Sequence, residues 1–228
     1  MATWAYGYHS LPAGATLSGN EKIFRPSYKD LPWTLAAENE LKPAVKLPVV
    51  LYLHGCRGIG AEDEHYRKFL LSLGYGVFMP DSFKCPGRLR CGNEGSLADR
   101  VRLRLKEIDY ALSKIRELPW VDNKRLILMG WSEGGNSVDN WARKGFSAHI
   151  IMASACTLMA ARAPAAAQGI PVLAITGTND EYRPGMSCEI KRTVGGSKSV
   201  IIAGAGHRLA NNTRAQAAIK LFLNQCCT

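Results

Sequence analysis

The chain has 228 residues, of which 46% are hydrophobic and 21% are charged, and its formal net charge at pH 7 is +10. This composition is typical of a globular protein with a full core and excludes a disordered chain. No linker rich in Pro, Gly or Ser divides the sequence, so we expect one domain over residues 1–228.

The positive charge is scattered along the chain rather than gathered in a binding motif. Its densest cluster lies on one expected helix and consists of Arg100, Arg102, Arg104 and Lys106. We expect a solvated helix face there and no nucleic-acid partner, because neither aromatic interleaving nor a known binding motif accompanies the charge. A basic surface of this kind still attracts acidic substrates.

The sequence predicts neither a membrane span nor a signal peptide. No apolar run approaches the ~20 residues that a span needs. The N-terminal part holds no basic start followed by an apolar core. We therefore expect a cytoplasmic protein without membrane contact. The alternative is a secreted or periplasmic protein whose signal peptide has been removed.

Expected strands and helices alternate along most of the chain. A short strand over 21–26 and a polar insert come first. The continuous apolar run PVVLYLHG (48–55) is then typical of a strand covered on both faces. Further strands are expected over 75–81, 125–130, 149–154, 171–177 and 199–204. Helices are expected over 65–73, 97–118, 133–144 and 213–224; the second has the clearest apolar stripe and ends before Pro119.

This order of elements predicts the α/β class. Right-handed crossovers between successive strands give a mostly parallel central sheet with helices on both faces, which is a three-layer sandwich. In such sheets the chemistry collects beyond the carboxyl ends of the strands. Candidate residues should therefore stand just after expected strands.

The segment GWSEG (130–134) fits the pattern G-x-S-x-G, with an expected strand before it and an expected helix after it. A turn this tight forces the serine toward strained backbone angles, and side chains two residues before and after it would collide, so glycine occupies both places. The turn lifts the hydroxyl of Ser132 off the sheet edge, and the next helix aims its first amides at an anion formed there. Ser132 is the candidate nucleophile, although an ordinary glycine-rich turn has the same pattern.

A serine hydroxyl needs a base, and the base needs an orienting acid. In this architecture the acid and then the histidine follow the serine along the chain. Asp180 stands after an expected strand in GTND, and His207 stands after the next one in GAGH. These two residues are the candidate acid and base, with Glu181 as the second choice of acid. Taken separately, Asp180 could form an Asx turn and His207 could be an ordinary loop residue.

Two backbone amides should stabilise the oxyanion of the reaction. One is the amide of Glu133, directly after the nucleophile, and the other is expected from the loop after PVVLYLHG. Cys56 is the candidate second donor, with Arg57 next. His54 precedes this turn, so we expect it to be a structural hydrogen-bonding residue.

The seven cysteines are an odd number, so at least one thiol is unpaired within the chain. Cys85 and Cys91 flank a short loop and could form a disulfide in an oxidising compartment. The favoured expectation is that the cysteines are reduced and serve as small apolar residues. Ser154 and Cys156 follow an expected strand and could line the pocket. No Cys/His cluster has zinc spacing, so no metal ion is expected.

With these residues placed, the chain resembles the dienelactone hydrolase family of the α/β-hydrolase superfamily. The matching segments are LYLHGCRGIG, GYGVFMPDSF, WVDNKRLILMGWSEGG, AITGTNDEYRP and GAGH, and they run in family order from about residue 21 to the C-terminus. The resemblance implies an α/β-hydrolase fold, a hydrolase without a cofactor, and Ser132, Asp180 and His207 as the catalytic triad.

Three positions differ from the members of the family that cleave dienelactones. Those members have a cysteine in place of Ser132, and they hold the substrate carboxylate with arginines where this chain has Cys85 and Asn211. The arginines that could replace them are Arg57, Arg88, Arg90 and Arg208. The sequence therefore favours a serine enzyme that acts on a general ester, lactone or thioester.

The predicted function is that of an esterase or lactonase that acts on small molecules through an acyl-enzyme intermediate. Trp131, Arg57 and Arg208 are expected to contact the substrate. A small aminopeptidase of the same fold and a non-catalytic binding protein are the alternatives. We expect a monomer or a homodimer, with no cofactor.

Overall fold

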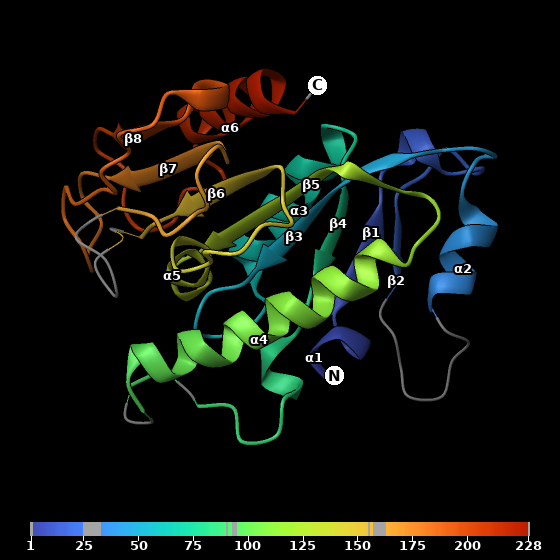
Figure 1. Ribbon diagram of the computed structural model, residues 1–228, viewed down its shortest axis with the longest axis horizontal. Helices are drawn as coiled ribbons and strands as arrows, with labels where there is room; N and C mark the ends of the chain where they lie inside the picture. The colour runs from blue at the N-terminus through green and yellow to red at the C-terminus, as the bar shows by residue number, and fades with distance from the viewer. Residues whose placement is uncertain are drawn as a thin grey trace.

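The structure, a computed structural model, describes residues 2–24, 33–89, 91, 92, 95–154, 156 and 163–227. One eight-stranded sheet with the order β2-β1-β4-β3-β5-β6-β7-β8 runs through it (Figure 1). The strands are β1 (Tyr8–Leu11), β2 (Lys22–Phe24), β3 (Leu47–Leu53), β4 (Gly76–Met79), β5 (Val121–Trp131), β6 (Ala148–Met152), β7 (Val172–Gly177) and β8 (Lys198–Ile202). β1 pairs antiparallel with β2 and β4, and β3 to β8 pair in parallel. The predicted α/β class is confirmed.

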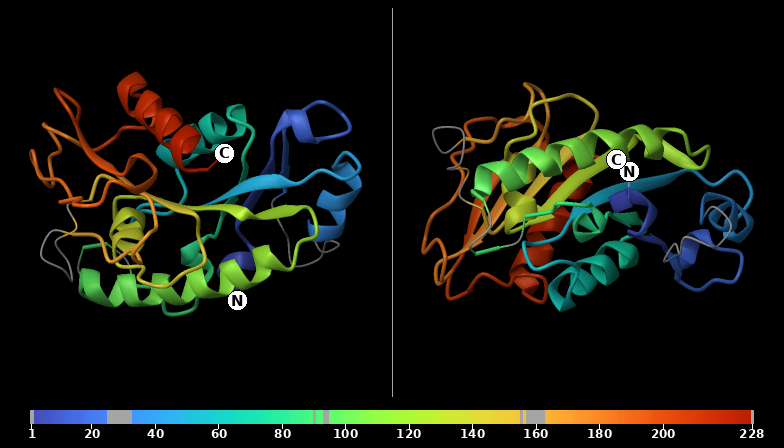
Figure 2. Two further views of the ribbon diagram at one scale, coloured as in Figure 1. Left: turned by 45° about the horizontal axis from the view of Figure 1, so that its top comes forward. Right: turned by 90° about the horizontal axis from the view of Figure 1, so that it is seen from below.

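Helices cover both faces of the sheet. They are α1 (Ala2–Ala5), α2 (Trp33–Glu40), α3 (Ala61–Ser72), α4 (Leu97–Arg116), α5 (Glu133–Asp139) and α6 (Thr213–Cys226), with 3-10 turns η1 (Ala13–Ala15), η2 (Ser82–Lys84) and η3 (Val194–Gly196). The two views of Figure 2 place α4 on one side of the sheet and α3 and α6 on the other. Among the described helices, none combines the length and the apolar character that crossing a membrane requires.

The alternation of side chains along the strands produces two hydrophobic cores. In β3, Leu51 and Leu53 belong to the core under α4, while Val50 and Tyr52 belong to the core under α3 and α6. All four side chains are fully buried. A strand buried on both faces reads as a continuous apolar run, which explains why these central strands are predictable from the sequence.

The observed elements differ from the expected ones in the N-terminal part and after Ser132. Neither α1 nor β1, which are four residues each, is expected from the sequence, and α2 falls within the expected polar insert. The helix after Ser132 ends at Asp139 instead of 144. The side-chain amide of Asn140 donates to the carbonyl of Asn136 (2.7 Å), and the amide of Trp141 donates to that of Val138 (3.1 Å), which closes the last turn.

The prediction of a solvated basic face on α4 is wrong for two of its arginines. Arg104 is fully buried, and its Nε lies 3.2 Å from a carboxylate oxygen of the equally buried Glu107. Arg100 is largely buried and pairs with Glu133 (2.8 Å). Arg104 stands three residues after Val101 and is therefore on the apolar stripe itself.

Candidate active site

Ser132 lies in the turn between β5 and α5, with φ of 57° and ψ of −116°. This positive φ is strained for a residue other than glycine. A Cβ on Gly130 would lie 2.4 Å from the carbonyl carbon of Gly134, and a Cβ on Gly134 would lie 2.0 Å from the carbonyl oxygen of Leu53. The close approach of the chain therefore requires both glycines of the motif.

Three side chains from separate strand ends meet above this turn. Nε2 of His207 lies 2.9 Å from Oγ of Ser132, and Nδ1 lies 2.8 Å from Oδ2 of Asp180. The carboxyl of Asp180 is buried, and its Oδ1 accepts hydrogen bonds from the amides of Tyr182 (2.9 Å) and Arg183 (3.2 Å). With its proton on Nδ1, the imidazole can accept the serine proton at Nε2.

The main chain of His207 is held on both sides. Its amide donates to a carboxylate oxygen of Glu181 (3.2 Å), and its carbonyl accepts from Nε1 of Trp131 (2.9 Å). The rings of Trp131 and Tyr182 lie close to the imidazole, with centroid distances of 5.2 Å and 4.7 Å. Asp180 thus contacts the ring of the histidine, while Glu181, the second choice of acid, supports its backbone.

A pocket of about 390 Å³ opens over Ser132. Its lining includes seven of the eight residues predicted as catalytic, oxyanion-stabilising or substrate-binding: Cys56, Arg57, Trp131, Ser132, Glu133, His207 and Arg208. The eighth, Asp180, lies behind His207. Arg57 and Arg208 are exposed at this pocket. Arg88 instead packs against Glu133, and Arg90 lies outside the described residues.

The backbone amides of Cys56 and Glu133 are the candidate oxyanion donors. Both residues line the pocket, one after β3 and the other directly after Ser132. Within the part of the chain that the structure describes, neither amide donates a hydrogen bond to the protein. Both donors are therefore free for an oxygen atom bound in the pocket.

The structure corrects the expectation for the cysteines. Cys91 is bonded to Cys56 rather than to Cys85, and two further disulfides join Cys156 to Cys188 and Cys226 to Cys227, so that Cys85 alone is free. The cysteines are thus not simply small apolar residues. Cys56 and Cys91 are distant in sequence, but their Cα atoms lie 5.6 Å apart, within the usual range for a disulfide.

Ser154 and Cys156 do not line the pocket, contrary to expectation; Ala153 takes that place. The hydroxyl of Ser154 instead donates to Oδ2 of Asp139 (2.6 Å) at the end of α5. Burial raises the pKa of Asp139 to about 7, against the opposing effects of this hydrogen bond and of the nearby Arg183.

His54 has the structural role that its position predicts. Its Nδ1 donates to the carbonyl of Gly55 (2.6 Å), and its Nε2 accepts from the amide of Ser82 (3.0 Å). Burial, reinforced by the charge of Arg104, holds the pKa of His54 well below its usual value. A neutral imidazole is what this pattern of one donor and one acceptor requires.

The pocket also contains residues that were not expected from the sequence, among them Leu97, Arg100, Asn136, Tyr182 and Arg183. The position of Tyr182, two residues after Asp180, is the one local signal that could have pointed to it. In the described part of the chain, no group of three or more His, Cys, Asp or Glu side chains is arranged to hold a metal ion.

The sequence model of the dienelactone hydrolase family matches residues 35–220 of the chain. A search of curated proteins finds no significant match.

Solved structures similar to this one include esterase PE8, with a TM-score of 0.61 and 18% identity over 80% of this chain and 94% of that one. Est1E from Butyrivibrio proteoclasticus has a TM-score of 0.54 and 17% identity over 80% and 90% of the two chains. An alpha-beta serine hydrolase homologue from Coxiella burnetii has a TM-score of 0.51 and 15% identity over 80% and 87%. At this level of identity the likeness extends to the fold alone.

Proposed function

As its match over residues 35–220 shows, the chain belongs to the dienelactone hydrolase family, and from this we propose that it is a serine esterase or lactonase acting on small molecules. The observation that carries the proposal is the line of contacts from Asp180 through His207 to Ser132 beside the pocket. The fold likeness to esterases agrees with it.

The proposed reaction is acyl transfer in two steps. His207 takes the proton of Ser132 as its oxygen attacks the carbonyl carbon of the substrate, and the amides of Cys56 and Glu133 stabilise the resulting oxyanion. The imidazolium then protonates the leaving alcohol, which leaves an acyl-enzyme on Ser132. Water repeats the same steps to release the acid.

Asp180 keeps the imidazole in the correct tautomer and stabilises its positive charge. Its own carboxylate is fixed by the two backbone amides that donate to it, so it holds the ring in one orientation. Trp131 and Tyr182 lie against the same ring.

The substrate is expected to be small, because the pocket of about 390 Å³ is near the lower end of the range for small-molecule sites. Trp131 offers an apolar surface beside the nucleophile, and Arg57 and Arg208 offer positive charge at the opening. Esters or lactones that carry an apolar acyl group and a polar or anionic end fit this distribution.

A fluorophosphonate probe tests the nucleophile. It should label the wild type and not Ser132→Ala, and hydrolysis of short p-nitrophenyl esters should vanish in parallel. A wild type that does not react with the probe would contradict the proposal and favour a binding protein. Labelling together with turnover of peptide amides, but not of esters, would identify an aminopeptidase instead.

The two neighbouring acids provide a matched test of the orienting residue. Asp180→Asn should lower kcat by roughly 10³- to 10⁴-fold, because the wrong tautomer of the imidazole is then favoured. Glu181→Gln should lower it by no more than about tenfold, because only a hydrogen bond to the backbone of His207 weakens. Steady-state kinetics on one ester compares both variants, and the reverse order of effects would exclude Asp180 as the orienting acid.

We further infer that the protein works in an oxidising compartment, which favours the secreted or periplasmic alternative. The support is that six of its seven cysteines are paired. Thiol titration of protein isolated under non-reducing conditions tests this inference: one reactive thiol per chain agrees with it, and seven contradict it.

A further inference from the structure

We propose that Arg88, Cys91 and Arg100 are positioning residues that hold both oxyanion amides in place, through the side chains of Glu133 and Cys56. We call this set of contacts the brace. The proposal rests on the function proposed above. It concerns how the two donors are kept at a fixed separation, since they come from turns that lie far apart in the sequence.

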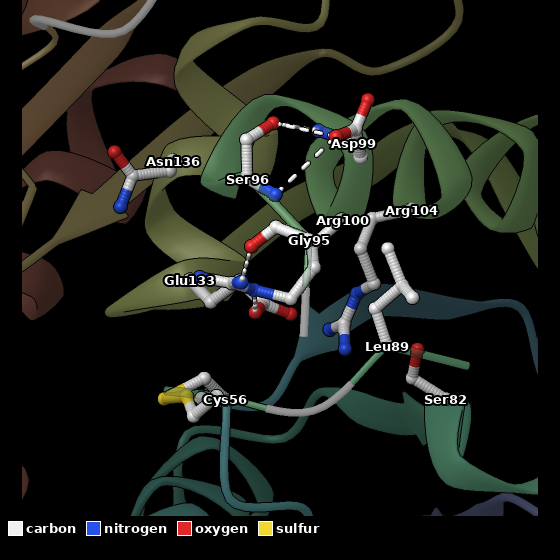
Figure 3. Close-up of polar contacts among 12 residues, drawn as sticks. Cys56, Ser82, Leu89, Gly95, Ser96, Asp99, Arg100, Arg104, Glu133 and Asn136 are labelled. Atoms are coloured by element: carbon white, nitrogen blue, oxygen red, sulfur yellow. Dashed lines mark hydrogen bonds and ion pairs between the residues drawn. A yellow bond between two sulfur atoms is a disulfide. The ribbon is translucent and has the colours of Figure 1, made fainter. Parts of the chain in front are cut away.

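The first half of the brace holds Glu133. Both oxygens of its carboxylate are paired with arginines: Oε1 with Nη2 of Arg88, and Oε2 with Nε of Arg100 at 2.8 Å. Figure 3 shows Arg100 beside Glu133. The side chains of Glu133 and Arg88 are each 2% exposed, and that of Arg100 is 11% exposed. The residue after the nucleophile is therefore held at both oxygens of its carboxylate.

The two arginines are themselves anchored. Nε of Arg88 donates to the hydroxyl of Ser82 (2.7 Å), and that hydroxyl donates to Glu107 on α4 (2.7 Å). Arg100 also stands on α4, and its Nη1 donates to the carbonyl of Gly95 (3.0 Å). The longest helix of the described chain is thus connected to the start of α5 by buried charges.

The second half of the brace holds Cys56. Its sulfur is bonded to Cys91, which lies between Arg88 and Arg100 in the sequence, and both cysteines line the pocket. The two amides are consequently tied to the same stretch of chain, one through a pair of ion pairs and the other through a covalent bond.

This arrangement matters because an oxyanion hole depends on geometry. Its donors must lie about 2.7–3.1 Å from the oxyanion, and a misplacement of about 1 Å can cost roughly 100-fold in rate. The paired ends of β3 and β5 place the two turns side by side, and the ion pairs and the disulfide hold the residues that carry the two amides. A carboxylate placed directly after a nucleophile would also repel the oxyanion if the two arginines did not neutralise it.

Steady-state kinetics of Arg100→Met and Cys91→Ser provides the test. Each variant should lower kcat by roughly 10- to 100-fold while KM stays within about threefold, because the bound ester itself needs the amides less than the oxyanion does. Arg102→Met, an exposed arginine on the same helix, is the matched control for the first variant. Cys226→Ser, which opens a different disulfide, is the control for the second.

Inhibition by a phenylboronic acid separates positioning from general loosening. The boronate forms a tetrahedral adduct on Ser132 that occupies the oxyanion position, so its Ki should rise in parallel with the fall in kcat/KM, while Ki for the acid product stays constant. Arg100→Lys, which keeps the charge, should recover part of the loss. Equal weakening of both inhibitors would overturn the proposal.

Failure of the brace and failure of the proposed function give different results. If Ser132→Ala abolishes turnover but Arg100→Met and Cys91→Ser fold and keep the wild-type kcat, the brace is wrong and the hydrolase stands. If Ser132→Ala remains active, the proposed function itself fails. We chose to replace Arg100 rather than Arg88 because Arg100 is less buried, so that the variant is expected to fold. Thermal denaturation verifies that it does.

Discussion

Gly134 packs against the carbonyl oxygen of Leu53 so closely that even a methyl group has no space. Gly134→Ala should therefore destabilise the fold by more than about 3 kcal/mol or displace Ser132 and abolish activity. Gly14→Ala is the control, since no atom lies within 4 Å of the place its methyl group would take, and it should be close to neutral. Urea denaturation with an ester assay compares the two, and a stable, active Gly134→Ala would contradict the account of the turn.

The raised pKa of Asp139 predicts a specific dependence of stability on pH. Between its ordinary value of 3.8 and about 7, the folded chain binds more protons at this carboxyl than the unfolded chain does. The stability of the wild type should therefore fall relative to that of Asp139→Asn as the pH rises through this range, by up to about 4 kcal/mol.

Urea denaturation from pH 4.5 to 8 measures this difference. Asp122→Asn is the control, because a hydrogen bond from Arg125 lowers the pKa of Asp122 and places its effect below this range. Its curve should run parallel to that of the wild type. If the curve of Asp139→Asn also runs parallel to that of the wild type, Asp139 is ionised in the folded protein throughout this pH range.

Among the elements of the fold, helix α4 buries charged side chains together with its apolar ones. Arg104→Met removes one partner of a buried ion pair and leaves the carboxylate of Glu107 without its compensating charge. We expect a loss of about 3–5 kcal/mol in the free energy of unfolding. Arg102→Met, at an exposed pair on the same helix, should change it by no more than about 0.5 kcal/mol. Equal effects in urea denaturation would mean that Arg104 is solvated after all.

The elements that the sequence predicts are those whose pattern is local. The central strands are apolar runs because both of their faces are buried, and α4 has an apolar stripe. The short β1 has no such run; it is a strand because β2 and β4 lie on either side of it. Such pairing depends on other strands of the chain, so the residues of β1 and their immediate neighbours do not predict it.

The same distinction applies to the candidate site. Ser132, Asp180 and His207 are predictable because each follows a strand in a fixed order. The burial of Arg100 depends on Glu133, which is far away in the sequence, and the bond between Cys56 and Cys91 spans 35 residues. Charge alone suggests a solvated arginine, and loop length alone suggests the nearer Cys85 as the partner of Cys91. Both inferences fail because tertiary contacts decide them.

On the scale of the whole molecule, the disulfide between Cys156 and Cys188 links the segments that follow β6 and β7. Cys188→Ser should lower the free energy of unfolding by about 2–4 kcal/mol, because the unfolded chain gains the entropy of an open loop. Cys85→Ser, at the free thiol, should change it by less than about 0.5 kcal/mol.

Urea denaturation under non-reducing conditions measures both variants, and peptide mapping of the wild type verifies the pairing. A stability of Cys188→Ser equal to that of the wild type would indicate that this bond does not form in the folded protein.

Three pairs among seven cysteines leave one sulfur, that of the partly exposed Cys85, for outside reagents. A maleimide dye should consequently attach at a single place and give a homogeneous conjugate. If two copies form an intermolecular disulfide without exchanging the existing disulfides, both must use the sulfur of Cys85. The product is then a two-fold symmetric dimer that cannot add further copies through disulfides.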